Sequence, residues 1–185
     1  GFAVTGSFCT FEKMLQSMAA CREAGFDILP ILSPAAASTD TRFGRAADFI
    51  RRIEELSGRP VILDIPGAEP IGPKNLTDIM LVAPCTGNTI AKLANGVTDN
   101  CVTMAVKSHL RGGKPVVLAV STNDALSGSA ANLGALLNRR HYYFVPFRQD
   151  DPFRKPASLV ADFTRVPDAL EAALRGEQLQ PLLCM

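Results

Sequence analysis

The sequence has only two histidines, no closely spaced cysteine pair and no long apolar run, and these absences exclude several classes of protein. Its 185 residues include five cysteines, an odd number, and no two of them have the C-x-x-C spacing of zinc and redox motifs. We therefore expect reduced thiols, no disulfide framework and no metal site. No apolar run reaches the roughly 18 residues of a membrane-spanning helix, so we expect no membrane segment.

A marked excess of charge of either sign is also missing. Nineteen lysines and arginines stand against 18 aspartates and glutamates, which gives a formal net charge of +1. The charges are scattered, so nothing indicates the basic stripe of a nucleic-acid binder. The first residues show neither a basic leader nor a cleavage site, and we expect a cytoplasmic protein. Because strand-like residues start at once, we also expect a few residues to precede Gly1.

Short apolar runs alternate with helical periodicity along the whole chain. The predicted strands are residues 2–5, 27–32, 61–63, 78–83, 115–120 and 142–145. The predicted helices are residues 11–24, 42–56, 89–94, 102–110, 132–137 and 166–174. Because the strands are continuously apolar, each should be buried on both faces. We predict a single α/β domain over residues 1–185, with a three-layer doubly wound parallel sheet of Rossmann-like or flavodoxin-like type.

Small polar residues follow four of the predicted strands. Each turn alone would be an ordinary turn or helix cap. The carboxyl ends of parallel strands share one edge of the sheet, so together the turns predict one crevice for a phosphorylated or polycarboxylate ligand. The residues expected there are Gly6, Ser7, Ser33, the 38–42 turn, Thr86, Asn88, Thr89, Ser121, Thr122 and Asn123.

Three segments resemble the flavoprotein family of homo-oligomeric flavin-containing cysteine decarboxylases. They are Val4-Thr-Gly-Ser7, the run from Leu81 to Asn100 with its Thr86-Gly-Asn-Thr-Ile-Ala-Lys92 block, and Lys114-Pro-Val-Val-Leu-Ala119. The resemblance implies a Rossmann-like subunit in trimers or multiples of trimers, with an FMN-type site. It implies a cofactor-binding role for Gly6, Ser7, Ser33, Thr86, Asn88 and Thr89, and we expect Ser121 and Thr122 after the following strand to share this role.

The chain departs from that family at two places that bear on the chemistry. The decarboxylases carry a histidine in the stretch that corresponds to residues 69–76, and this chain has none there. Their substrate-clamping Pro-x-Met-Asn motif becomes Val120-Ser-Thr-Asn123, which keeps only the asparagine. We therefore do not expect a cysteine decarboxylase.

With these departures, the sequence resembles one branch of the family, the B subunits of two-subunit enzymes of spore-forming bacteria. Matching segments are residues 38–44, 68–74, 121–126 and 146–156, and the tail from 179 to 183. The branch implies that the chain works with an A subunit to oxidise a dihydropyridine dicarboxylate to the aromatic diacid in the mother-cell cytoplasm. NADP is the acceptor expected for the complex, and FMN in this chain stays open.

Such a substrate carries two carboxylates, which basic side chains bind well. Arg42, Lys74 and Arg148 are predicted to bind it, with Arg154 and Lys155 as further candidates, although long basic side chains are equally typical of solvated surface. Arg42 and Asn123 are also candidates for a catalytic role. The base stays unassigned among Asp124, Asp150 and Asp151.

For several further residues we favour an ordinary structural role over a functional one. Lys92 is expected on a solvated helix face, Cys85 as packing, and Phe43 and Phe49 in the core, whereas Phe147 and Phe153 stay open. Residues 146–158 should form an irregular arm suited to reach a neighbouring subunit, followed by a terminal helix and tail. Two other functions remain: a non-catalytic scaffold subunit of the same complex, and an FMN-dependent reductase or prenyltransferase-like enzyme.

Overall fold

The computed structural model describes residues 1–184 and has a seven-stranded sheet at its centre. Four parallel strands form its middle in the order β2 (Pro30–Leu32), β1 (Phe2–Val4), β3 (Met80–Cys85), β4 (Val116–Thr122). The start of β4 pairs in parallel with β5 (Tyr142–Phe144), and its end pairs antiparallel with β7 (Leu159–Ala161), which is followed by β6 (Phe147–Arg148). The order 2-1-3-4-5 of the parallel strands is the flavodoxin-like one.

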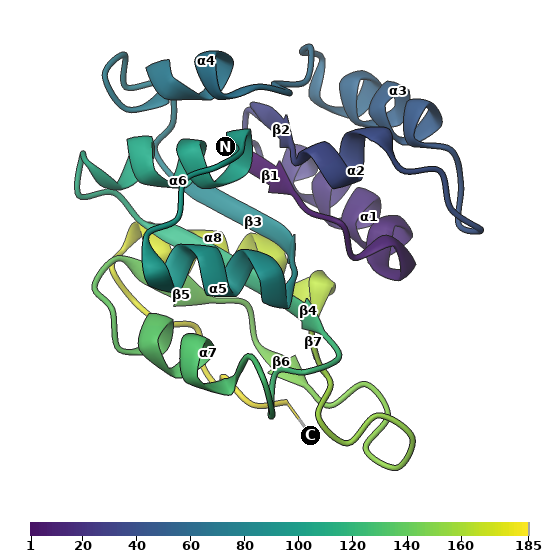
Figure 1. Cartoon of the computed structure of the whole chain (residues 1–185). Helices are drawn as coiled ribbons and strands as arrows, with labels where there is room; N and C mark the ends of the chain where they lie inside the picture. The colour runs from purple at the N-terminus through teal and green to yellow at the C-terminus, as the bar shows by residue number, and fades with distance from the viewer. Residues whose placement is uncertain (185) are drawn as a thin grey trace.

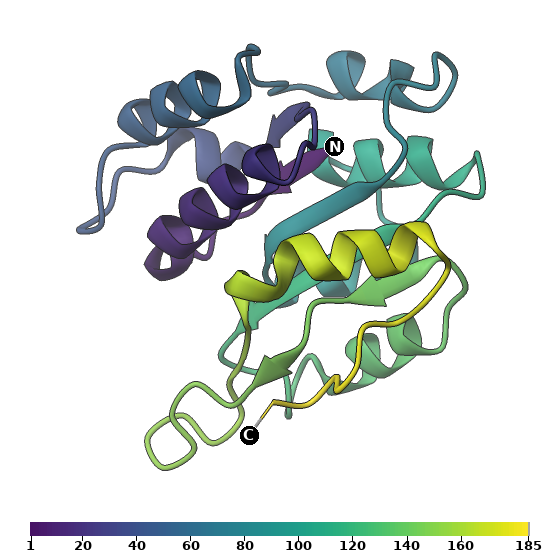
Figure 2. The same cartoon turned by 180° about the vertical axis from the view of Figure 1, so that it is seen from behind.

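Helices cover both faces of the sheet (Figures 1 and 2). One face carries α1 (Phe11–Glu23), α3 (Ala46–Ser57) and α8 (Val166–Leu174). The other carries α4 (Ile65–Ala68), α5 (Gly87–Asn95), α6 (Cys101–Leu110) and α7 (Ala130–Leu137). The short α2 (Pro34–Ser38) follows β2 directly. The predicted three-layer α/β fold is therefore confirmed. None of the helices in residues 1–184 is long and apolar enough to cross a bilayer.

The central strands are apolar without alternation because both of their faces are covered. Along β3, Leu81 and Ala83 pack into the core on the α1 side. Their neighbours Met80 and Val82 pack into the core on the α6 side. All six residues of β3 are buried. This arrangement accounts for the continuous apolar runs from which the parallel sheet was predicted.

Some predicted elements differ from the structure. The strand expected at residues 61–63 is reduced to a single bridge between Ile62 and Ile31. The arm expected at 146–158 is partly regular, because β6 and β7 form an antiparallel pair at its base and leave residues 149–158 as the loop. The sheet is thus mixed. β7 pairs with β6 and with the end of β4, which is distant in sequence, and β6 has only two residues, too few to show a periodic signal. The helices α2 and α4 were not predicted for the same reason.

The helix predicted from Arg42 begins later in the structure. α3 starts at Ala46, whose amide donates to Oδ1 of Asp40 at 2.8 Å. The four residues from Thr41 to Gly44 form a tight turn with backbone hydrogen bonds in both directions. Arg42 is exposed in this turn, so it extends the polar loop after β2 rather than the first turn of a helix.

One of the two histidines is buried at the amino ends of β3 and β4. The hydroxyl of Thr77 donates to Nδ1 of His109 at 2.8 Å, and Nε2 donates to the carbonyl of Pro115 at 2.9 Å. Only 2% of His109 is exposed. Burial lowers the pKa of this imidazole from 6.5 to about 4, against the raising effect of the Pro115 carbonyl.

This histidine predicts a loss of stability in acid. The unfolded chain binds a proton near pH 6.5 and the folded protein only near pH 4, so acidification across this interval favours unfolding, by about 3 kcal/mol in total. Denaturant unfolding at pH 7 and pH 4 should show that His109→Gln loses less stability over this range than the unmodified protein. The exposed His141, changed to Asn, is the matched control and should follow the unmodified protein. Equal losses in all three proteins would contradict the assignment.

Candidate functional site

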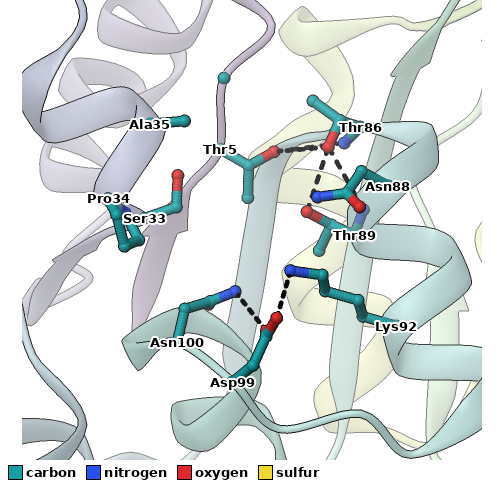
Figure 3. A pocket seen from close by; sticks show the side chains of 11 residues that line it. Thr5, Ser33, Pro34, Ala35, Thr86, Asn88, Thr89, Lys92, Asp99 and Asn100 are labelled. Atoms are coloured by element: carbon teal, nitrogen blue, oxygen red, sulfur yellow. Dashed lines mark hydrogen bonds and ion pairs between the residues drawn. The ribbon is translucent and has the colours of Figure 1, made fainter.

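A cavity of about 530 Å³ opens at the carboxyl ends of β1 and β3 (Figure 3). The strand order reverses between these two strands, which is where open α/β sheets bind ligands. Thr5 and Gly6 line it from the end of β1, Ser33 from the end of β2, and Thr86 from the end of β3. The volume lies within the range of small-molecule sites. We call this cavity the first lobe of the crevice.

Thr5 joins the two strand ends at the bottom of the first lobe. Its hydroxyl donates to the carbonyl of Pro84 at 2.7 Å and accepts from the amide of Thr86 at 3.2 Å. Thr5 is only 2% exposed, so both bonds lie inside the protein. The side chain therefore holds the turn after β3 in place against β1.

The turn after β3 starts helix α5 and directs its first amides towards the first lobe. Thr86 caps the helix, with Oγ1 accepting from the amide of Thr89 at 3.3 Å and lying 3.1 Å from the Thr89 hydroxyl. Asn88 is exposed in the lobe, and within residues 1–184 its carboxamide has no hydrogen-bond partner. Free amides and the helix dipole at this end attract an anion. The crevice thus offers donors without a fixed partner.

A cation and an anion form the outer wall of the first lobe. Nζ of Lys92 lies 2.7 Å from Oδ2 of Asp99, and the carboxamide of Asn100 donates to the other carboxylate oxygen at 3.0 Å (Figure 3). Lys92 holds the pKa of Asp99 below its usual value. Lys92 is largely covered, with 23% of its side chain exposed, so the solvated position expected from the sequence is wrong. Helical periodicity places it a turn after Asn88 but does not reveal the loop that folds over it.

A second cavity of about 340 Å³ adjoins the first and shares Gly6 and Thr86 with it. We call it the second lobe. The hydroxyls of Ser7 and Ser121 lie 2.8 Å apart there and link the turns after β1 and β4. Asn123 lines the same lobe. The predicted cofactor residues therefore fall into two groups: Ser33, Asn88 and Thr89 in the first lobe, and Ser7, Ser121 and Thr122 in the second, with Gly6 and Thr86 in both.

The loop after β4 is fixed by Asp124, one of the candidate bases. Its carboxylate accepts from the hydroxyl of Thr122 at 2.5 Å and from that of Ser129 at 2.9 Å. A Cβ on Gly87 would stand 2.6 to 2.8 Å from polar atoms of these three side chains. A glycine at the start of α5 thus allows the loop to pack closely. Asp124 is engaged in holding it.

The other two candidate bases lie in the arm loop. Asp150 and Lys155 line the second lobe, and Oδ2 of Asp150 is 2.7 Å from Nζ of Lys155. This contact raises the pKa of Lys155. Asp151 caps the loop by accepting from the amide of Arg154 at 3.0 Å. The arm loop therefore contributes one carboxylate and one ammonium group to the second lobe, and the two are paired with each other.

The three predicted substrate-binding cations line neither lobe. Arg42 is exposed in the turn before α3, with its guanidinium 4.8 Å from the centre of the Phe43 ring. Lys74 precedes β3 and therefore lies towards the amino ends of the strands, on the opposite edge from the crevice. Arg148 lines a separate cavity of about 410 Å³ between α1 and β7. In a parallel sheet, residues shortly before a strand lie at the edge opposite to residues that directly follow a strand, and this places Lys74 away from the crevice.

The remaining expectations concern packing. Cys85 is fully buried, and burial raises the pKa of its thiol, which fits packing rather than nucleophilic chemistry. Phe49 and Phe147 are buried, whereas Phe43 is 44% and Phe153 95% exposed, so the core position expected for Phe43 is wrong. Within residues 1–184 no group of three or more His, Cys, Asp or Glu side chains could hold a metal ion.

Asp99 and Asn100 were missed as site residues by the sequence analysis. Asn100 caps α6 through a capping box with Thr103, and this helix start brings Asp99 over the first lobe. An Asn three residues before a Thr, ahead of an apolar helix, is a readable cap. It predicts where the helix begins, but only the fold shows which cavity the cap borders.

Comparison with known proteins shows the family to which the chain belongs. Residues 1–146 match the model of the family described as Flavoprotein. The chain belongs to the flavoprotein family. Over 183 residues this family member is 45% identical to the B subunit of dipicolinate synthase of Bacillus subtilis (strain 168), and the match covers 99% of the chain and 92% of the relative.

Solved structures agree with this placement. The crystal structure of the B subunit of dipicolinate synthase from Bacillus halodurans C superposes with a TM-score of 0.92, at 43% identity, over 100% of this flavoprotein and 95% of the other chain. The FMN-dependent cysteine decarboxylase SpaF superposes with a TM-score of 0.70 over 93% of this chain and 94% of its own, and at 21% identity this shows the shared fold alone. The resemblance to the flavoprotein family, and to its branch of B subunits, is thus confirmed.

Proposed function

We propose that this flavoprotein is the B subunit of a dipicolinate synthase and works with an A subunit to oxidise a dihydrodipicolinate-type intermediate to dipicolinate in a spore-forming bacterium. The observation that carries the proposal is the 45% identity to the B subunit of a dipicolinate synthase over 99% of the chain. The lack of a histidine in residues 69–76 supports an activity other than cysteine decarboxylation.

The crevice fits a planar anionic group. The first lobe offers the free start of α5 and Asn88 to a phosphate or carboxylate, and Pro34 and Ala35 as small apolar walls. These residues suit FMN, on which the similarly folded SpaF depends, and the phosphate of NADP equally. A flavin or nicotinamide held there would supply the hydride acceptor. We propose NADP as the acceptor of the complex and FMN as the alternative ligand of the crevice in this chain.

In this proposal the residues of the chain bind and orient the ligand and balance its charge. Donors at the start of α5 would hold and orient the anionic ligand, and a fixed orientation can account for much of an enzyme's rate enhancement. Asn123 in the second lobe would contact the substrate from the other side. Lys92 would balance the ligand's charge while Asp99 keeps it in position.

Arg42, Lys74 and Arg148 can serve the substrate only from a different surface, since none lines the crevice. We propose that Arg42 and the arm loop act at an interface between subunits, in a homo-oligomer built from trimers or in contact with the A subunit. Phe153, at 95% exposure in the arm loop, is available for such a contact. Lys74 lies at the far edge of the sheet and is therefore the least suited of the three to contact the substrate.

Complementation tests the proposal. The A subunit, this chain and their mixture are each supplied with the dihydropyridine substrate and NADP, and dipicolinate is followed by its ultraviolet absorbance. We expect product from the mixture at a rate well above that of either protein alone. A yellow purified chain that turns over without the A subunit would instead support an FMN-dependent enzyme. A mixture that is no faster than the A subunit alone would leave only a scaffold role.

A further inference from the structure

A third cavity, of about 370 Å³, lies outside the crevice among the carboxyl-terminal ends of α5, α6 and α7. The three helices lie next to one another on the front face in Figure 1. We call this hollow the helix cavity. It shares only Lys92 with the first lobe, and the ammonium of Lys92 is already held by Asp99. The helix cavity is thus a separate site.

Cations surround the helix cavity, and no acidic side chain lines it. Lys107 and Arg111 stand four residues apart at the end of α6, so their charges repel each other. Both are exposed, and within residues 1–184 neither forms an ion pair. Arg139 adds a third positive charge, fixed by hydrogen bonds from its guanidinium to the carbonyls of Leu93 at 3.1 Å and Ala94 at 2.9 Å. An anion would relieve the repulsion among these groups.

A largely buried tyrosine whose hydroxyl has no hydrogen-bond partner is the second observation. Tyr142 lines the helix cavity and is only 8% exposed, yet its hydroxyl forms no hydrogen bond with any group in residues 1–184. Every fully buried side-chain oxygen or nitrogen in the described chain has a partner, so this hydroxyl retains contact with solvent, and the cavity provides it. Burial raises the pKa of Tyr142 to about 12, so the hydroxyl keeps its proton and is a donor.

The wall of the helix cavity is apolar between these polar groups. Leu93 of α5 and Val106 and Leu110 of α6 line it. Leu93 and Val106 are at most 5% exposed and belong to the core, so they present a fixed surface. An apolar wall with a few convergent donors is typical of a small-molecule site rather than of an inorganic anion site.

We propose that the helix cavity binds a small aromatic carboxylate. The ring packs against Leu93, Val106 and Leu110, and the carboxylate accepts from the Tyr142 hydroxyl between the charges of Lys107 and Arg111. This site is distinct from the proposed catalytic crevice, and its existence does not depend on dipicolinate formation. A flat diacid suits it because more than one unpaired cation faces the cavity.

Titration calorimetry of the purified, assembled protein with isophthalate tests the proposal. Isophthalate combines a flat ring with two carboxylates. We expect Tyr142→Phe to weaken its binding by about fivefold to tenfold. The double variant K107Q/R111Q should weaken it by at least about tenfold. Tyr143→Phe removes a hydroxyl one residue away, outside the cavity, and is the matched control that should bind as the unmodified protein does.

Two further measurements separate this site from the crevice. Asn88→Ala should leave isophthalate binding in the helix cavity unchanged, and neutral isophthalamide should not bind. Because the proposed substrate of the crevice is also a flat dicarboxylate, Tyr142→Phe and K107Q/R111Q are compared in the Asn88→Asp background, which weakens binding in the crevice. Isophthalate binding that neither substitution changes in that background would overturn the proposal, as would binding that Asn88→Asp alone abolishes. An absence of isophthalate binding at millimolar concentration would also overturn it.

Discussion

Asn88→Asp is expected to lower kcat/KM for dipicolinate formation by the reconstituted pair by between about 10- and 100-fold. The substitution preserves the size of the side chain but places a negative charge in the first lobe, beside the free amides of α5. Two like charges about 4 Å apart at a protein surface repel by up to about 4 kcal/mol, and solvent exposure of Asn88 reduces this. Steady-state kinetics with the A subunit in excess measures the effect.

Asn138→Asp provides the matched control for this change. Asn138 is exposed at the end of α7 and lines neither lobe, so the same change of charge there should leave kcat/KM unaltered. Because of the helix dipole, Asn88→Asp at the start of α5 should be slightly more stable than the unmodified protein and Asn138→Asp at the end of α7 slightly less, each by at most about 1 kcal/mol. Equal kcat/KM for the two variants would show that no anion binds at the start of α5.

Gly72→Ala is expected to reduce the free energy of unfolding by about 3 kcal/mol or more. Gly72 crosses α6 so closely that a Cβ would stand 2.0 Å from the backbone carbonyl oxygen of Ser108. The Ser108 hydroxyl also accepts from the Gly72 amide at 2.8 Å and donates to the carbonyl of Glu69 at 2.7 Å. A backbone oxygen cannot move aside as a flexible side chain can, so the whole segment must shift.

Gly134→Ala is the same substitution at a site with no neighbour. Within residues 1–184 its Cβ would meet nothing within 4 Å, and Gly134 lies inside α7. Alanine there should stabilise the helix by roughly 0.5 to 1 kcal/mol. The denaturant concentration at the midpoint of unfolding should therefore fall in Gly72→Ala and rise in Gly134→Ala. A Gly72→Ala protein as stable as the unmodified one would contradict the close crossing of residues 69–76 over α6.

The crevice could be predicted because its residues follow strands. Thr86, Asn88 and Thr89 come directly after a continuous apolar run, and in a parallel sheet this sequence position fixes the edge on which they lie. The same rule brought Ser33 and Ser121 to that edge. The order of the strands in the sheet determines which of these residues share a lobe. The sequence does not reveal this order, because the strands are short and similar in composition.

The long basic residues could not be placed in the same way. Arg42 lies in a turn, Arg148 ends the two-residue strand β6, and Lys92 lies in α5 beneath the loop that carries Asp99, so their surroundings depend on neighbouring loops. The turn closed by Gly44 leaves Arg42 exposed, whereas the loop bearing Asp99 covers Lys92. Periodicity describes helices and strands, and the contacts that decide these three positions lie between elements.

The absence of a histidine in residues 69–76 has a structural counterpart. This segment packs across α6 and lines neither lobe of its own chain, so no side chain of it can act in the crevice described here. The buried His109 does not replace it, because both of its nitrogens are bonded at the opposite edge of the sheet. Within residues 1–184, no imidazole therefore lies beside the polar crevice.

Titration of a fixed amount of A subunit with this chain tests the central claim most directly, with the rate of dipicolinate formation as the measurement. We predict a rate that rises with added chain and saturates when the two proteins are fully associated, and a much smaller rise with Asn88→Asp. A rate that stays at the level of the A subunit alone at every concentration would contradict the assignment of this flavoprotein as a functional B subunit.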